Sequence, residues 1–218
     1  MAGTFITFEG IDGSGKSTQL RLVSSYLDEL GCDLVTTREP GGTTLGLRLR
    51  AALLDAQEEV DPLTELLVFA ADRAQHVRRV LRPALEDGRV VISDRYADAT
   101  AAYQGAGRGF DPQLISEIIR LATEGLVPDL TLLFDVPVEE STNRTNRRSN
   151  TKNKPDRLDI EHVDFYHRVR AAYLDIAAKE PGRVKVIDTS GPVEATQESV
   201  RTILVQFLRS RGHLKANV

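Results

Sequence analysis

The chain has 218 residues, a length that fits one large domain with a substantial buried core. Its composition is that of an ordinary globular protein, with 41% hydrophobic and 28% charged residues. The formal net charge of -4 excludes a general attraction to nucleic acid or to anionic membranes, so any basic patch must be local.

Short apolar runs alternate with segments of helical periodicity along the whole chain. In chain order the patterns predict a strand over 4–8, a helix over 20–30, a strand over 33–39, helices over 45–53 and 61–82, a strand over 89–93, a helix over 111–119, a strand over 129–136, a basic helix over 138–148, a helix over 165–176, a strand over 183–188 and a helix over 200–208. Gly31 ends the first helix, and Asp61-Pro62 and Asp111-Pro112 are typical of helix starts.

Five apolar strands that alternate with helices predict an α/β fold in three layers. We expect a five-stranded, mainly parallel sheet flanked by helices, in a single domain over residues 1–218. In such sheets ligands bind at the carboxyl ends of the strands. The site is therefore expected where the predicted strands end.

One cysteine and an unremarkable N-terminus indicate a cytoplasmic protein. The single cysteine, Cys32, excludes an intramolecular disulfide and suits a reducing compartment. We expect no signal peptide and no membrane association, because no basic segment precedes a long apolar stretch and no apolar run approaches membrane-spanning length.

The stretch after the first predicted strand matches a phosphate-binding loop. Residues 10–17 read GIDGSGKS and fit G-x-x-x-x-G-K-[ST], with a strand before them and a helix after them. Glycines let successive amides face phosphate oxygens, and the helix N-terminus favours anions. A chance glycine turn is the alternative, which the flanking strand and helix disfavour. The residues expected to hold the nucleotide are Gly10, Ile11, Asp12, Gly13, Ser14, Gly15, Lys16, Ser17 and Thr18.

Two charged residues at the end of strand 89–93 point to a metal ion and to a second phosphate. Lys16 is expected to reach the β- and γ-phosphates, while Ser17 and Asp94 ligate Mg²⁺ from opposite sides. A carboxylate at a strand end is also a common cap. Arg95 suits a bidentate grip on an acceptor phosphate, and a surface salt bridge is its alternative.

Five stretches resemble the bacterial thymidylate kinases in order and spacing over nearly the whole chain: FEGIDGSGKST (8–18), TREPGGT (37–43), LLVFAADRAQHV (66–77), SDRYADATAAYQGAGRG (93–109) and PDRLD (155–159). The first is shared by all phosphate-loop enzymes, whereas the middle three together are specific. The resemblance implies Mg²⁺-dependent transfer of the ATP γ-phosphoryl group to dTMP, which gives ADP and dTDP for dTTP synthesis. It also implies a homodimer; helix 61–82 would be a candidate interface, although the core explains its apolar stripe equally well.

The resemblance further implies how the acceptor is bound. In the family, the counterpart of Phe69 stacks on thymine and that of Arg73 hydrogen-bonds the base, and residues four apart share one helix face. A core phenylalanine and a surface arginine are the alternative. Thr100 and Gln104 are similar to residues that read the base edge, and Tyr103 would lie under the sugar. The matches near the phosphates are Arg50 and Arg95 on the acceptor phosphate, Glu39 and Pro40 beside it, and Asp12 at the reacting groups.

A basic segment over residues 142–157 is predicted to be a mobile lid. It has no carboxylate before Asp156, and Gly13 stands where some family members have an arginine. The cations that a phosphoryl-transfer transition state needs would therefore come from the lid, which delivers Arg144 and Arg148. A solvated basic loop or a nucleic-acid patch is the alternative.

The sequence as a whole predicts a nucleoside monophosphate kinase that acts on ATP and dTMP. We expect no zinc site, no general base and no nucleic-acid partner, because the acceptor phosphate is already nucleophilic. Three alternatives stay open at this point: another monophosphate acceptor, a regulatory ATPase, and nucleic-acid binding through the basic segment. The residues expected to act in catalysis are Lys16, Arg95, Arg144, Arg148 and Asp12.

Overall fold

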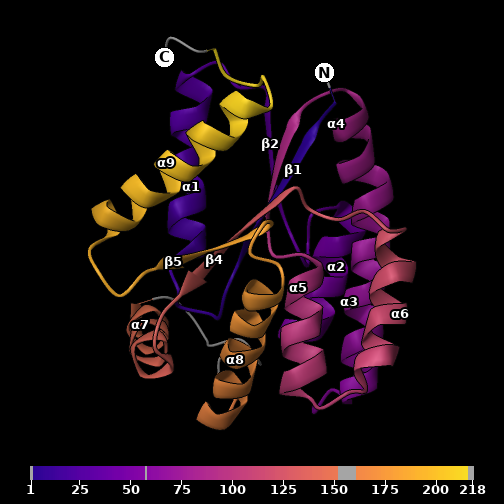
Figure 1. Ribbon diagram of the computed structural model, residues 1–218. Helices are drawn as coiled ribbons and strands as arrows, with labels where there is room; N and C mark the ends of the chain where they lie inside the picture. The colour runs from indigo at the N-terminus through magenta and orange to yellow at the C-terminus, as the bar shows by residue number, and fades with distance from the viewer. Residues whose placement is uncertain (1, 57, 152–160, 216–218) are drawn as a thin grey trace.

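The structure, a computed structural model, describes residues 2–56, 58–151 and 161–215, with the backbone alone over 148–151. A five-stranded sheet forms its centre, in the order β2-β3-β1-β4-β5 (Figure 1). All its pairings are parallel, which confirms the predicted fold class and makes the mainly parallel sheet a wholly parallel one. The strands are β1 (Thr4–Glu9), β2 (Leu34–Arg38), β3 (Val90–Asp94), β4 (Leu130–Asp135) and β5 (Val184–Asp188).

Helices cover both faces of this sheet (Figure 1). They are α1 (Lys16–Glu29), α2 (Thr44–Leu54), α3 (Pro62–His76), α4 (Arg82–Glu86), α5 (Ala97–Thr100), α6 (Pro112–Thr123), α7 (Val138–Thr151), α8 (Val163–Lys179) and α9 (Val193–Ser210), with π-helical segments η1 (Val77–Leu81) and η2 (Ala101–Gly107). Helices α1 and α9 lie together on one face, whereas α4, α5 and α8 lie on the other. Among the described residues, no helix combines the length and the apolarity needed to cross a bilayer.

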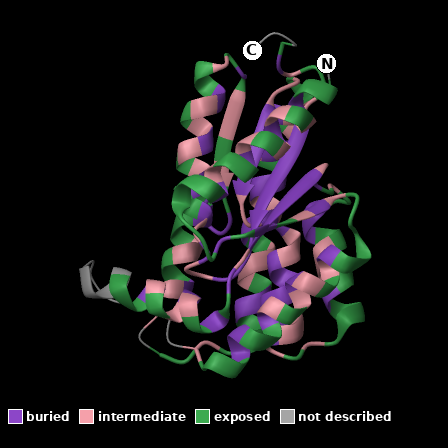
Figure 2. Cartoon of the chain, turned by 60° about the vertical axis from the view of Figure 1, so that its left-hand side comes forward, coloured by how far each residue is buried: buried purple, intermediate pink, exposed green. Residues whose placement is uncertain are grey.

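The alternation of side chains along β1 explains the two layers of the core. Ile6 and Phe8 are fully buried against α1 and α9, in a cluster that includes Leu27 and Leu204. Phe5 points to the other face and meets the ring of Tyr96 edge-on at a centroid distance of 4.8 Å. Because both faces are covered, the inner strands β1, β3 and β4 are buried along most of their length (Figure 2), whereas the edge strands β2 and β5 are partly exposed.

Two segments of the fold differ from the prediction. The helix expected over 61–82 is α3 followed by the π-helical turn η1, and it continues as α4 to Glu86. Pro83 lacks an N–H and crowds the preceding turn, which accounts for the altered winding there. The segment 97–107, for which no helix was predicted, forms α5 and η2. Its Gly107 is needed for packing, because a Cβ there would lie 2.6 Å from the ring of Phe165 on α8.

The strand order brings the sequence motifs to one edge of the sheet. In the parallel ladders Phe8 of β1 and Arg38 of β2 both lie opposite Asp94 of β3. The phosphate-loop motif, the Glu39-Pro40 segment and Arg95 therefore leave three neighbouring strands at the same edge. This edge lies at the switch between the two halves of the sheet, where ligands bind in open α/β folds.

Candidate active site

The loop after β1 has the backbone that a phosphate-binding loop requires. Gly10, Gly13 and Gly15 all have positive φ angles, of 138°, 77° and 92°. A Cβ at Gly10 would lie 2.4 Å from the carbonyl oxygen of Phe134, so only glycine fits there. A Cβ at Gly13 would lie 2.5 Å from the carbonyl oxygen of Ser141, so a larger side chain has no room there. The loop leads directly into the N-terminus of α1.

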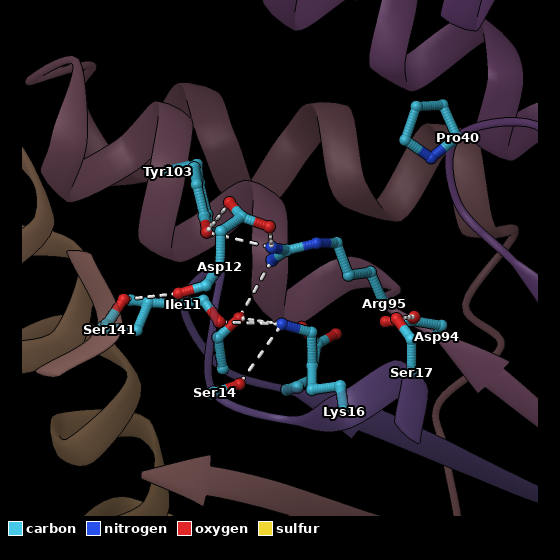
Figure 3. Close-up of polar contacts among 12 residues, drawn as sticks. Ile11, Asp12, Ser14, Lys16, Ser17, Pro40, Asp94, Arg95, Tyr103 and Ser141 are labelled. Atoms are coloured by element: carbon cyan, nitrogen blue, oxygen red, sulfur yellow. Dashed lines mark hydrogen bonds and ion pairs between the residues drawn. The ribbon is translucent and has the colours of Figure 1, made fainter. Parts of the chain in front are cut away.

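Lys16 is buried beneath this loop rather than exposed to solvent. Its ammonium donates to the carbonyl oxygens of Gly10 at 2.8 Å and Ile11 at 2.9 Å, with Ser14 Oγ at 3.4 Å (Figure 3). Burial, together with the nearby Arg95 cation, lowers the pKa of Lys16 to about 8. A lysine held in this way is still mostly protonated at neutral pH, and its ammonium is already stripped of water.

Ser17 and Asp94 meet as expected. The hydroxyl of Ser17 donates to Asp94 Oδ2 at 2.8 Å (Figure 3). This oxygen pair fits Mg²⁺, which usually keeps several waters and takes further oxygens from substrate phosphates. Within the described residues, no group of three or more His, Cys, Asp or Glu side chains could hold a metal ion by itself.

Arg95 connects the phosphate loop to the neighbouring cavity. It has a left-handed backbone, with φ of 73°, and its Nη2 donates to Asp12 Oδ1 at 2.8 Å and to the Tyr103 hydroxyl at 3.0 Å. Nη1 donates to the Gly10 carbonyl oxygen at 3.1 Å. Burial works against the charge on Asp12, but the Arg95 and Lys16 cations outweigh it and lower the pKa of that carboxyl below its ordinary range. Tyr103 also donates to Asp12 Oδ2 at 2.9 Å, so Asp12, Arg95 and Tyr103 are joined in one hydrogen-bonded cluster (Figure 3).

A cleft of about 540 Å³ runs along the phosphate loop. Its lining extends from Arg50 and Arg95 to Thr189 and Val193, at the start of α9. Arg144 of α7 also lines it, donating to the Thr189 carbonyl oxygen at 2.7 Å and pairing with Glu140. The Arg148 side chain, the PDRLD motif and the lid residues from 152 onward lie outside the described residues.

A second cavity adjoins this cleft. Four residues line both: Asp12, Glu39, Arg50 and Arg95. The remaining lining brings together the side chains predicted to bind the base and the sugar, with Pro40 and two apolar neighbours: Pro40, Leu54, Phe69, Arg73, Ala99, Thr100, Tyr103 and Gln104. The structure thus brings segments that are far apart in the sequence together in one cavity.

Arg73 is only 3% exposed, so the alternative of a surface arginine is wrong. Its Nε donates to Glu39 Oε2 at 2.7 Å and its Nη1 to Thr100 Oγ1 at 2.7 Å. The other oxygen of Glu39 lies 2.8 Å from His76 Nδ1, while His76 Nε2 lies 2.7 Å from Thr37 Oγ1. His76 was not predicted. Its position three residues after Arg73, on the same helix face, was the available signal.

Glu9 is a second residue that sequence reasoning missed. It ends β1 completely buried, accepting from the Tyr96 amide at 2.7 Å and from the Tyr173 hydroxyl at 2.8 Å. Burial, reinforced by the Asp98 carboxylate, raises the pKa of Glu9 to about 8. The side chain is therefore mostly neutral at neutral pH.

Glu9→Gln is expected to flatten the pH dependence of stability. The folded state prefers the protonated form of Glu9. The resulting contribution to the free energy of unfolding is therefore fully present below pH 4.5, the ordinary pKa, and is lost as the pH rises to about 8. The neutral amide removes that loss, which is on the order of a few kcal/mol. Urea unfolding at intervals from pH 4.5 to 8.5 measures it. Exposed Glu198→Gln is the control, and parallel curves for Glu9→Gln and wild type would contradict the assignment.

Two features define the class of this protein. A phosphate loop follows the first strand of a wholly parallel sheet, and a second cavity meets the cleft along that loop. Together they are typical of the P-loop nucleoside monophosphate kinases. The family model described as thymidylate kinase matches residues 8–200. A thymidylate kinase of Desulfovibrio desulfuricans is 48% identical over 212 residues, 95% of this chain and 98% of the relative. One of Leifsonia xyli subsp. xyli is 50% identical over 199 residues, 91% and 93% of the two chains.

The solved structures agree with these sequences. The crystal structure of the thymidylate kinase from Ehrlichia chaffeensis matches with a TM-score of 0.75 and 38% identity, covering 94% of this chain and 99% of that one. The chain belongs to the thymidylate kinase family.

Proposed function

We propose that this protein transfers the γ-phosphoryl group of ATP to dTMP and releases ADP and dTDP. The observation that carries the proposal is the junction of two cavities at Asp12, Glu39, Arg50 and Arg95. One cavity follows a phosphate loop and the other is lined by an aromatic ring and polar groups. A triphosphate and a monophosphate in these cavities would meet at charged side chains.

The donor cleft supports ATP as the phosphoryl source. The amides of the loop and the N-terminus of α1 would hold the phosphates, and Lys16 would exchange its carbonyl partners for the β- and γ-phosphate oxygens. Ser17 and Asp94 would hold Mg²⁺, which when bound neutralises charge on the phosphate oxygens.

The acceptor cavity supports a pyrimidine deoxynucleotide. Phe69 offers an aromatic face to a planar base, and Arg73 and Gln104 offer polar groups to its edge. Tyr103 lies beside Arg95, so a sugar next to the acceptor phosphate would lie against its ring. Arg50 and Arg95 would hold that phosphate, with Glu39 and Pro40 beside it.

Catalysis in this arrangement would depend on alignment and charge. An oxygen of the acceptor phosphate attacks the γ-phosphorus, the bond to the β-phosphate oxygen breaks, and no general base is required. Lys16 and Arg95 stabilise the charge on the transferred group, while Asp12 keeps Arg95 in place. We also infer that residues 142–157 form a lid that contributes Arg144 and Arg148, since Arg144 lines the donor cleft.

A coupled ADP-release assay over a panel of monophosphates tests the proposed function. With ATP and Mg²⁺, dTMP is expected to give the highest kcat/KM, above dUMP, dCMP and AMP, and EDTA is expected to abolish turnover. A purine preference would contradict the role of Phe69 and Arg73. Slow hydrolysis that no monophosphate accelerates would favour a regulatory ATPase, and salt-dependent DNA binding that survives Lys16→Ala would favour a nucleic-acid protein.

We further infer that the enzyme is a cytoplasmic homodimer. The adjacent helices α3 and α6 leave Leu63, Leu67 and Leu121 exposed, the last at 75%. Apolar side chains gathered on neighbouring helices are typical of an interface between copies. Sedimentation is expected to give twice the chain mass of 24.1 kDa, and Leu67→Asp is expected to give the monomer.

A further inference from the structure

We propose that Glu65 fixes the orientation of the Gln104 side-chain amide. It thereby makes the acceptor cavity select a pyrimidine with a hydrogen-bond donor, rather than an acceptor, at ring position 3. Glu65 is a positioning residue: it does not line the cavity, and it acts through Gln104, which does. The proposal rests on the proposed function, because it requires a pyrimidine base in that cavity.

The contact between the two side chains is buried and direct. Gln104 Nε2 donates to Glu65 Oε1 at 2.9 Å, from helices far apart in the chain. Glu65 is 0% exposed and Gln104 is 2% exposed, so water cannot readily substitute for either partner. An ionised carboxylate only accepts hydrogen bonds. The nitrogen of the Gln104 amide must therefore face Glu65, and its oxygen takes the opposite side of the amide.

Arg108 maintains the charged, acceptor-only form of Glu65. Its Nε and Nη2 donate to the two Glu65 oxygens at 3.2 and 2.9 Å, a bidentate pair. Nη2 also donates to Glu161 at 2.6 Å, and the guanidinium lies 4.8 Å from the centre of the Phe165 ring. The bidentate guanidinium favours the ionised carboxylate, whose oxygens have further lone pairs that accept from Gln104.

The orientation of Gln104 has a chemical consequence for the substrate. Thymine and uracil carry a donor, N3–H, and an amide oxygen accepts from it. Cytosine and isocytosine carry an unprotonated acceptor nitrogen at position 3, which an amide oxygen repels. Arg73 offers donors only, so it favours a carbonyl at position 4. Glu65 thus adds a second criterion, independent of Arg73, because a freely rotating amide would accept either kind of nitrogen.

The test compares substrates that differ at position 3 and, necessarily, at the neighbouring position 2. The probe is the 5′-monophosphate of 5-methyl-2′-deoxyisocytidine, which keeps the 5-methyl group and the 4-carbonyl of dTMP but has an acceptor at N3 and an amino group in place of the 2-carbonyl. The change at position 2 is the same for every variant, so only the shift of the ratio between variants reports on Gln104. Glu65→Gln replaces the carboxylate by a group that both donates and accepts, so the Gln104 amide can turn over. We expect the ratio of kcat/KM for the probe to that for dTMP to rise about tenfold or more.

Three comparisons separate this role from a general structural one. The dUMP to dTMP ratio is expected to stay unchanged in Glu65→Gln, because both bases carry N3–H. Glu161→Gln removes the other carboxylate partner of Arg108 and is expected to keep the wild-type probe ratio. Glu65→Asp, which is still acceptor-only, is expected to retain the rejection of the probe.

Two outcomes would overturn the proposal. One is an unchanged probe ratio in folded Glu65→Gln that still phosphorylates dTMP. The other needs no variant: wild-type protein that uses the probe as well as dTMP has an amide free to turn. If wild-type protein fails to phosphorylate dTMP at all, the proposed function is wrong, which is a separate result.

Discussion

Lys16→Ala is expected to lower kcat by about 10²- to 10³-fold or more, the effect of deleting one preorganised cation at a developing charge. The ammonium is already desolvated beneath the phosphate loop, so it requires no reorganisation at the moment of transfer. The affinity for dTMP is expected to change little, because Lys16 lines only the donor cleft. Steady-state kinetics with ATP and dTMP, and dTMP titration by calorimetry, measure the two quantities.

The variant is expected to fold. Removing Lys16 deletes a buried charge together with its hydrogen bonds to two carbonyl oxygens, so losses and gains partly cancel. Thermal unfolding without nucleotide checks this point. Lys179→Ala, on the exposed end of α8, is the matched control and should retain wild-type kcat. Near-normal turnover in Lys16→Ala would refute the role of this lysine at the phosphates.

Arg95→Ala is expected to reduce kcat/KM for dTMP by about 10³-fold, with both kcat and KM affected. Arg95 lines both cavities, so it would contact the acceptor phosphate in the ground state and the transferred group in the transition state. Its loss also removes the ion pair with Asp12. The KM for ATP is expected to stay closer to its wild-type value than the KM for dTMP. Initial rates over a grid of ATP and dTMP concentrations give kcat and the two KM values separately.

Arg95→Lys tests the fork geometry rather than the charge. A lysine keeps the cation but cannot reach Asp12, Tyr103 and Gly10 together. The kcat/KM of Arg95→Lys is therefore expected to lie between those of Arg95→Ala and the wild type. Arg78→Ala removes a 64% exposed arginine from a surface pair with Glu124 and serves as the control. A loss confined to KM in Arg95→Ala would limit this arginine to acceptor binding.

The fold was predictable because its elements depend on near neighbours in the chain. The apolar strands and the stripes of α1 and α3 repeat every few residues, and the phosphate loop occupies consecutive positions. The segment 97–107 was not predictable in this way. Its glycines disfavour a helix by propensity, although Gly107 serves the close packing of η2 against Phe165.

The site was predictable in part. The phosphate loop, Ser17, Asp94 and Arg95 follow local motifs, and the residues of the second cavity followed from resemblance. His76 and Glu9 lie within stretches that carry the resemblance, but their contacts could not be predicted, because their partners lie far away in the chain: Glu9 and Tyr173 are 164 positions apart. Such pairs depend on the order of the strands and on the rotation of each helix about its axis.

The amino-acid sequence by itself therefore determined the class of fold, the phosphate loop and the chemistry of the strand ends, since these depend on short-range spacing. Only the tertiary structure decided that two cavities meet at Arg95, and that Arg73 and Gln104 are held by buried carboxylates. A hydrogen bond between distant segments requires both groups within about 3 Å and in line, and this geometry exists only once the sheet has assembled.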